Sequence, residues 1–242
     1  DAAQHLAFAQ PLVGELLVIG DDFNRQPALR QRLQVTQQCR PEDIDAVLAV
    51  NNRGSSGYGK TFFHLDDLKH GEHDLQDIVY GKKYLQSLNW IAADRIGVMG
   101  GSYGGYLVSW IAGHTERYKA LINHAGVYNL MGQFASDATT HRVHAYGGAP
   151  WSGLEIMQQW NPALFADKFV TPMLIMHGEQ DYRVPVTQGL EIYGVYKGKG
   201  LDARLVYFPN ENHWILKPNN SIFWFNEFTS WLKRYVPAGP TD

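Results

Sequence analysis

The sequence predicts an α/β fold, with a mostly parallel, doubly wound sheet and helices on both faces. Short apolar runs alternate with longer segments of helical periodicity along the 242 residues. No hairpin turns join the apolar runs, so consecutive strands are expected to be parallel. Hydrophobic residues make up 45% and charged residues 19%, an ordinary globular composition. We therefore expect residues 1–242 to form a single domain with a sizeable core.

Apolar runs place the strands, and apolar positions at helical spacing place the helices. The expected strands are residues 16–19, 46–50, 96–99, 119–124, 173–176 and 203–208. The expected helices are residues 27–38, 72–88, a helix from 103, then 186–197 and 222–235. Residues 127–170 interrupt the alternation with a long aromatic, turn-rich segment. We expect this segment to be an excursion above the sheet rather than a second core.

The most informative motif is GGSYGGY at residues 100–106, between an apolar strand and an apolar helix. A serine between glycines at a strand-to-helix junction is typical of the nucleophile elbow of the α/β-hydrolase fold. The sharp turn needs small neighbours, which Gly100 and Gly104 provide. A plain glycine-rich turn or a phosphate loop is the alternative, but both phosphate-binding patterns are absent. The motif predicts Ser102 as a nucleophile.

A serine nucleophile needs a histidine base that a carboxylate orients. In α/β-hydrolases these residues follow in the order serine, acid, histidine, each after a strand. Asp181 follows the strand at 173–176, and His213 follows the strand at 203–208. The predicted triad is therefore Ser102, Asp181 and His213.

Two neighbours of Asp181 are alternatives for these roles. His177 lies at a strand end and could compete as the base, but it precedes the acid and breaks the chain order. Glu179 could replace Asp181, yet it lies too close to the strand.

Several motifs together resemble the prolyl oligopeptidase family of serine peptidases. They are NRGSSGYGK at residues 52–60, the elbow, and HGEQDYRVP at 177–185. The segment FPNENHWILKPNNS at 208–221 is similar to the acylaminoacyl-peptidase and dipeptidyl-peptidase-5-like branch. The resemblance covers roughly residues 45–235. It implies an α/β-hydrolase catalytic domain that uses the predicted triad to attack an acyl carbon of a peptide or ester.

The oxyanion hole needs two donors directed at the developing negative charge. The backbone N–H of Tyr103, directly after the nucleophile, is the first predicted donor. Where the family carries a His-Gly-Gly-Pro-like loop, this chain reads IGDDF at residues 19–23. Gly20 is the candidate second donor, although the carboxylates of Asp21 and Asp22 would oppose an oxyanion there.

Three residues are predicted to bind substrate. The segment YGGAP at 146–150 resembles the family segment whose tyrosine lines the pocket for the residue before the cleaved bond, which implicates Tyr146 and, next to it, Trp151. Packing of a cap is the alternative for this aromatic cluster. Arg183 could bind a substrate carbonyl, or else form a helix-start salt bridge. Residues 52–58 are expected to be a structural loop that braces the site.

The composition argues against several classes of partner. A formal net charge of −3 disfavours a nucleic-acid partner. No apolar run approaches the roughly 18 residues of a membrane helix, so no membrane partner is expected. The single cysteine, Cys39, excludes an internal disulfide and leaves the compartment open.

No cofactor and no metal are expected. His70 and His73 are three residues apart among acidic neighbours, and residues 139–144 carry two further histidines. Neither segment has the His-Glu-x-x-His spacing of a zinc site on a helix.

The sequence thus predicts a serine hydrolase that acts on a short peptide or acyl ester. A homo-oligomer is a possible assembly. A carboxylesterase with the same triad is an alternative, favoured because the hydrolase motifs fill the chain and leave no room for a β-propeller. A second alternative is a catalytically weak interaction or regulatory domain, because Asp21 and Asp22 would oppose an oxyanion. Residue 1 is Asp rather than Met, which is consistent with an upstream segment, and no signal peptide is visible.

Overall fold

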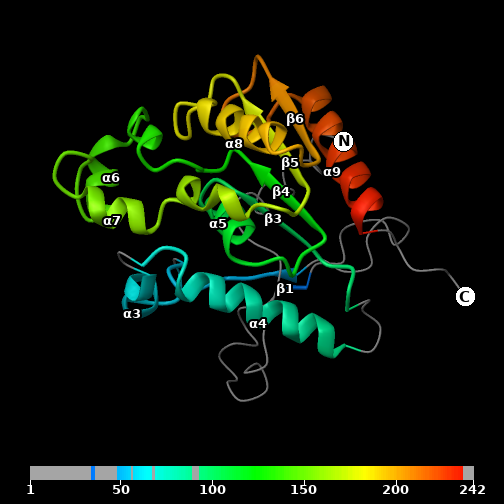
Figure 1. Ribbon diagram of the computed structural model, residues 1–242, viewed down its shortest axis with the longest axis horizontal. Helices are drawn as coiled ribbons and strands as arrows, with labels where there is room; N and C mark the ends of the chain where they lie inside the picture. Colours follow the sequence, from blue (N-terminus) through cyan, green and yellow to red (C-terminus); the bar gives the residue numbers. More distant parts are fainter. Residues whose placement is uncertain (1–33, 36–47, 56, 67–68, 89–92, 237–242) are drawn as a thin grey trace, which may run out of the picture.

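A computed structural model describes residues 34–35, 48–55, 57–66, 69–88 and 93–236 (Figure 1). Its main sheet has four parallel strands in the order β3-β4-β5-β6. These are β3 (Gly97–Gly101), β4 (Ala120–His124), β5 (Met173–Gly178) and β6 (Ala203–Phe208). A separate antiparallel pair joins β1 (Gln34–Val35) to β2 (Leu48–Ala49).

Helices connect and cover the strands (Figure 1). The long helices are α4 (His73–Ser87), α5 (Tyr103–His114), α8 (Thr187–Gly198) and α9 (Pro218–Tyr235). The short helices are α3 (Lys60–Phe63), α6 (Thr139–Ala145) and α7 (Leu154–Gln159). Single turns of 3₁₀ helix are η3 (His64–Asp66) and η4 (Gly132–Phe134), and a longer one is η5 (Pro162–Lys168).

The sheet separates two hydrophobic clusters, because successive side chains of a strand point to opposite faces. On one face, Leu121 and Ile175 pack with buried residues of α4, α5 and α8. On the other face, Ile122 and Leu174 pack with buried residues of α9. The strands are buried on both sides, which explains why they read as continuous apolar runs. The prediction of a parallel sheet with helices on both faces is confirmed.

One predicted helix is wrong in the part that the structure describes. Residues 27–38 were expected to be helical, but Gln34–Val35 form a strand, with Gln34 opposite Ala49 and Val35 opposite Leu48. The local signal was a run of polar residues with good helix propensity, which is a weak preference that distant strand pairing overrides. The predicted strand at 16–19 lies outside the described residues.

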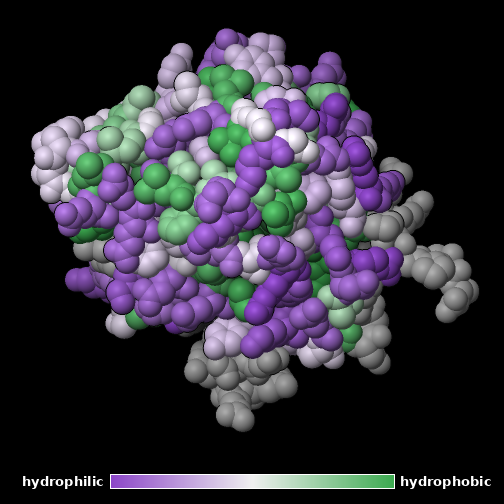
Figure 2. Space-filling view, in the orientation of Figure 1, coloured by the Kyte–Doolittle hydropathy of each residue, from purple (hydrophilic) through white to green (hydrophobic). Residues whose placement is uncertain are grey.

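Residues 127–170 contain η4, α6, α7 and η5. Figure 1 shows α6 and α7 projecting to the left of the sheet, and Figure 2 shows hydrophobic side chains gathered over this region. Asn161 anchors the return of this segment, because its side-chain carbonyl accepts from Ala163 N–H at 3.3 Å and from Leu130 N–H at 3.1 Å. Both ends of the excursion are thereby joined at one residue.

Among the described helices, none combines the length and the apolar character that crossing a membrane requires.

Candidate active site

Ser102 lies at the junction between β3 and α5, where the backbone turns sharply. Its φ is +57° and its ψ is −115°, a conformation that costs a non-glycine residue free energy and concentrates at functional sites. Two hydrogen bonds hold the turn: Ser102 N–H donates to the carbonyl of His124 at 2.9 Å, and Tyr106 N–H donates to the carbonyl of Ser102 at 3.0 Å. The serine is therefore fixed by the neighbouring strand β4.

The elbow also depends on a close approach of two backbones. A Cβ added to Gly105 would lie 2.4 Å from the Cα of Gly126, and one added to Gly126 would lie 2.5 Å from the Cα of Gly105. Gly100 and Gly104, the small residues expected beside the serine, are both buried. The first turn of α5 can pack against the end of β4 only because Gly105 and Gly126 both lack side chains.

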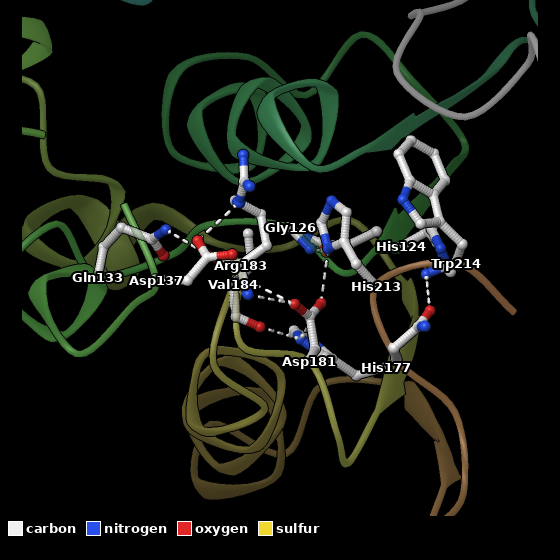
Figure 3. A network of polar contacts seen from close by, with 12 residues as sticks. His124, Gly126, Gln133, Asp137, His177, Asp181, Arg183, Val184, His213 and Trp214 are labelled. Carbon is white, nitrogen blue, oxygen red and sulfur yellow. Dashed lines mark hydrogen bonds and ion pairs between the residues drawn. The ribbon is translucent and has the colours of Figure 1, made fainter. Parts of the chain in front are cut away.

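The predicted acid and base are directly bonded (Figure 3). His213 Nδ1–H donates to Asp181 Oδ2 at 2.7 Å. The other oxygen of Asp181, Oδ1, accepts from the backbone N–H of Arg183 at 2.9 Å and of Val184 at 2.8 Å. Asp181 is 3% exposed and His213 is 8% exposed. The carboxylate is thus held by backbone donors on one side and orients the imidazole on the other.

His177 approaches the same carboxylate oxygen as His213 does. Its Nε2 is 3.4 Å from Asp181 Oδ2 and donates to the carbonyl of Val184 at 2.8 Å (Figure 3). Burial by itself would raise the pKa of Asp181, but hydrogen bonds from His177, His213 and Val184 N–H outweigh it. The pKa of Asp181 therefore lies well below its usual value, and the carboxyl stays ionised.

A second buried histidine, His124, lies behind the site at the end of β4. Its Nδ1 accepts from Trp224 Nε1–H at 3.1 Å, and its ring faces the backbone carbonyl of His213. Burial, together with the neighbouring His177 and His213, lowers the pKa of His124 to about 3. His124 is therefore neutral, and it connects the backbones of Ser102 and His213 through its own carbonyl and ring.

The sheet explains why residues so distant in sequence meet. Ser102, His124, Asp181 and His213 lie at or just after the carboxyl ends of the four parallel strands, which share one edge of the sheet. The structure joins Asp181 to His213, and it contains no hydrogen bond between Ser102 and His213, both of which are described. In unliganded sites such catalytic hydrogen bonds are often long.

A cavity of about 200 Å³ opens beside Ser102, and we call it the Ser102 cavity. Tyrosines, apolar side chains and basic side chains form most of its wall: His70, Ser102, Tyr103, Tyr106, Val127, Leu130, His141, Arg142, Ala145, Tyr146 and Val184. It lies between the elbow and α6, so the excursion at 127–170 forms one of its walls.

The Tyr103 side chain is fixed by a chain of polar contacts in this wall. Its hydroxyl donates to Asp74 Oδ2 at 2.7 Å and lies 3.2 Å from His70 Nδ1, while His70 Nε2–H donates to the carbonyl of Ala145 at 2.8 Å. The backbone N–H of Tyr103 is at the first position of α5, where helices bind negative charge. This geometry agrees with the predicted oxyanion donor.

The remaining predicted site residues fall in different places. Tyr146 is 8% exposed and lines the Ser102 cavity, and burial raises the pKa of its hydroxyl. Trp151 is 82% exposed, packs edge-on against Phe134 and lies outside the cavity wall. Arg183 turns to Asp137, with Nε 2.7 Å from Oδ1 (Figure 3). Gly20 lies outside the described residues, so the second oxyanion donor stays a prediction.

Two minor expectations can also be compared with the structure. The loop of residues 52–58 is tied to α4, because Arg53 donates to the carboxylate of Asp77 at 2.7 Å. Within the described ranges, no group of three potential ligands is close enough to hold a metal ion.

A scan of family models matches residues 43–238 to the prolyl oligopeptidase family of peptidases. The chain belongs to this family. Its curated relatives include dipeptidyl-peptidase 5 of Schizosaccharomyces pombe, 36% identical over 194 residues, and dipeptidyl-peptidase 5 of Porphyromonas endodontalis, 34% identical over 198 residues. Each alignment covers 78% of this chain and 28% of the relative. The chain thus spans just over a quarter of the length of these family members.

A solved structure of the same kind is the acylaminoacyl peptidase of Pyrococcus horikoshii. It superimposes with a TM-score of 0.75 at 27% sequence identity, covering 81% of this chain and 33% of that one. The predicted family and the α/β-hydrolase fold are confirmed.

Sequence reasoning left three residues of this site without a role. His177 was considered only as a competing base, although its position four residues before the acid was the available signal. His124 ends a buried strand, where a polar residue among apolar ones was a visible irregularity. Arg142 lies in a segment that was read only for metal ligands, and no local pattern places it in the cavity.

Proposed function

We propose that the chain is a serine hydrolase that cleaves peptide or acyl-peptide bonds through an acyl-enzyme. The observation that carries the proposal is the 2.7 Å bond between His213 Nδ1–H and the ionised, buried Asp181, at the sheet edge where Ser102 occupies a strained turn. A buried carboxylate that fixes one tautomer of a histidine leaves the other ring nitrogen available as a base.

In the proposed mechanism, His213 Nε2 takes the proton of the Ser102 hydroxyl as its oxygen attacks the substrate carbonyl. The tetrahedral intermediate places its negative charge toward the Tyr103 N–H. Collapse expels the leaving amine, which takes the proton from His213. Water then attacks the acyl-enzyme with His213 again as the base, and Ser102 is restored.

The substrate class is proposed from the relatives and from the Ser102 cavity. The relatives are named as dipeptidyl-peptidases, and the structural neighbour as an acylaminoacyl peptidase. Tyr146 and Tyr106 give the cavity aromatic walls beside the nucleophile, which suit the side chain before the scissile bond. Short peptides or acyl peptides are therefore the proposed substrates.

Labelling and turnover test this proposal together. The chain is incubated with a fluorophosphonate probe, with a short peptide p-nitroanilide and with a p-nitrophenyl ester. We expect labelling at Ser102 and hydrolysis of the p-nitroanilide, both of which Ser102→Ala abolishes. Labelling with ester turnover alone would identify a carboxylesterase. Absence of labelling would overturn the hydrolase and favour an interaction domain, and labelling that persists in Ser102→Ala would identify another serine as the nucleophile.

A further inference from the structure

The Ser102 cavity has an unbalanced set of charges in its wall. None of its described lining residues is acidic, whereas His70, His141 and Arg142 are basic or can become so. Arginine remains charged at every working pH. The wall therefore carries at least one fixed positive charge close to the nucleophile.

Arg142 lacks an acidic partner within the described part of the chain. Its Nη2 donates to the backbone carbonyl of Arg183 at 3.3 Å, and its side chain hydrogen bonds to Tyr146. Its Nε is buried and has no hydrogen-bond partner among the described residues. A guanidinium that is half-buried with an unsatisfied donor has lost hydration without gaining a counter-charge.

The neighbouring Arg183 gives an internal comparison. Its guanidinium is exposed to solvent and is paired with Asp137, with 2.7 Å between Nε and Oδ1. The half-buried guanidinium is thus the one without a carboxylate, and the exposed one has a carboxylate. A solvated arginine needs a counter-ion less than a half-buried one does, so this distribution points to a carboxylate for Arg142 from outside the described part of the chain.

We propose that Arg142 is a specificity-determining residue that binds the acidic side chain of the substrate residue before the cleaved bond. The inference rests on the proposed hydrolase function and adds to it a preference for glutamate or aspartate at that position. A carboxylate in the cavity would pair with the Arg142 guanidinium and would face no acidic side chain of the described wall. The tyrosines of the wall would pack against the methylene groups that lead to the carboxylate.

Two substrates that differ only in the charge of one side chain test whether that charge is recognised. Acetyl-Ala-Glu and acetyl-Ala-Gln are each prepared as a p-nitroanilide and as a thioester, and kcat/KM is measured between pH 7 and 9. We expect glutamate to exceed glutamine by about 10- to 100-fold, the range for hydrogen bonds to charged groups. The ratio should stay constant over this pH range, because arginine keeps its charge, whereas an unperturbed histidine loses its charge above about pH 6.5.

Three variants separate charge from shape. Arg142→Met should reduce the Glu/Gln ratio to near one while the chain still reacts with the fluorophosphonate probe. Arg142→Lys should retain part of the ratio. Arg204→Gln removes one positive charge on β6, where Arg204 pairs with Glu227 away from the cavity, and should leave the ratio unchanged.

A binding measurement keeps this proposal distinct from the proposed catalysis. Calorimetry compares acetyl-Ala-Glu-amide with acetyl-Ala-Gln-amide on the Ser102→Ala chain, and on the same chain with Arg142→Met added. Tighter binding of the glutamate peptide that requires Arg142 supports the proposal even without turnover. Equal binding of the two peptides, or a Glu/Gln ratio unaffected by Arg142→Met, overturns it. Failure of fluorophosphonate labelling alone overturns only the catalytic function.

Discussion

The sheet edge and the excursion at residues 127–170 form opposite sides of the same cavity and are built differently. At the edge, the functional residues end a strand or follow it by a few residues, and backbone N–H groups of Arg183 and Val184 hold Asp181. In the excursion, Arg142 lies on a helix of seven residues with no buried residue of its own. The residues of the proposed chemistry are therefore held by the sheet, whereas the proposed selectivity rests on a short helix outside it.

The largest expected effect comes from breaking the edge at its acid. Asp181→Asn keeps an acceptor for Arg183 and Val184 but presents an amide to His213 Nδ1, which favours the wrong imidazole tautomer. We expect kcat to fall by about 10⁴-fold, as when the orienting aspartate of a catalytic triad is replaced. Steady-state kinetics on a p-nitroanilide measure this loss.

The neighbouring Glu179 supplies the control, because its side chain is exposed. Glu179→Gln should change kcat by less than about twofold, because surface substitutions away from buried or bonded groups have small effects. If Glu179→Gln proved the more damaging variant, the assignment of the acid would be wrong.

The next effect concerns the close approach behind the elbow. Gly105→Ala places a methyl group 2.4 Å from the Cα of Gly126, and neither backbone can move without shifting Ser102 or β4. We expect the free energy of unfolding to fall by about 1–3 kcal/mol, seen as a lower melting temperature in calorimetry.

Gly194 in α8 is a matched helical glycine with open space around its Cβ position. Gly194→Ala should raise the free energy of unfolding by about 0.5–1 kcal/mol, because alanine is the better helix former. Equal effects at the two glycines would contradict the close packing of the elbow.

A smaller effect is the pH dependence of the free energy of unfolding, which His124 at the sheet edge should produce. The pKa of His124 is lowered to about 3 from an ordinary value of 6.5, so between these values the unfolded chain binds a proton that the folded chain does not. Stability linked to His124 is therefore complete above pH 6.5 and is lost as pH falls. Relative to His124→Gln, the native chain should lose about 1.4 kcal/mol per pH unit.

Urea unfolding at pH 7.5, 6 and 5 measures this slope. The other titratable groups near His124 are His177, His213 and Asp181. The depressed pKa of Asp181 stabilises the fold above the ordinary carboxyl range and loses that effect only at lower pH. Parallel pH profiles for the native chain and His124→Gln would show that His124 is charged in the folded state.

The smallest expected effect lies at the outer part of the excursion. Trp151 is 82% exposed and outside the wall of the Ser102 cavity. Trp151→Ala should change kcat/KM for a short p-nitroanilide by less than about twofold, as expected for a substitution on the surface. A larger loss of kcat/KM without loss of stability would support the sequence-based prediction that Trp151 contacts substrate.

Local sequence patterns were sufficient to predict a residue's position wherever one strand and the turn after it specify that position. The four strands of the main sheet and the order Ser102, Asp181, His213 are of this kind, because parallel strands place their carboxyl ends at one edge. The strand at Gln34–Val35 was missed, since its backbone bonds go to Leu48 and Ala49 in a distant segment. Propensity over a short window contains no information about that partner.

Local sequence patterns were enough to predict the fold class, the elbow and the pairing of Asp181 with His213. The folded structure was needed to find the basic groups around them: His177 against the acid, His124 behind the base, Arg142 in the cavity and Arg183 paired with Asp137. Side chains from other elements set how deeply each of these groups is buried and which counter-charge it meets. A residue's neighbours along the chain therefore specify its conformation, whereas its neighbours in space specify its charge environment.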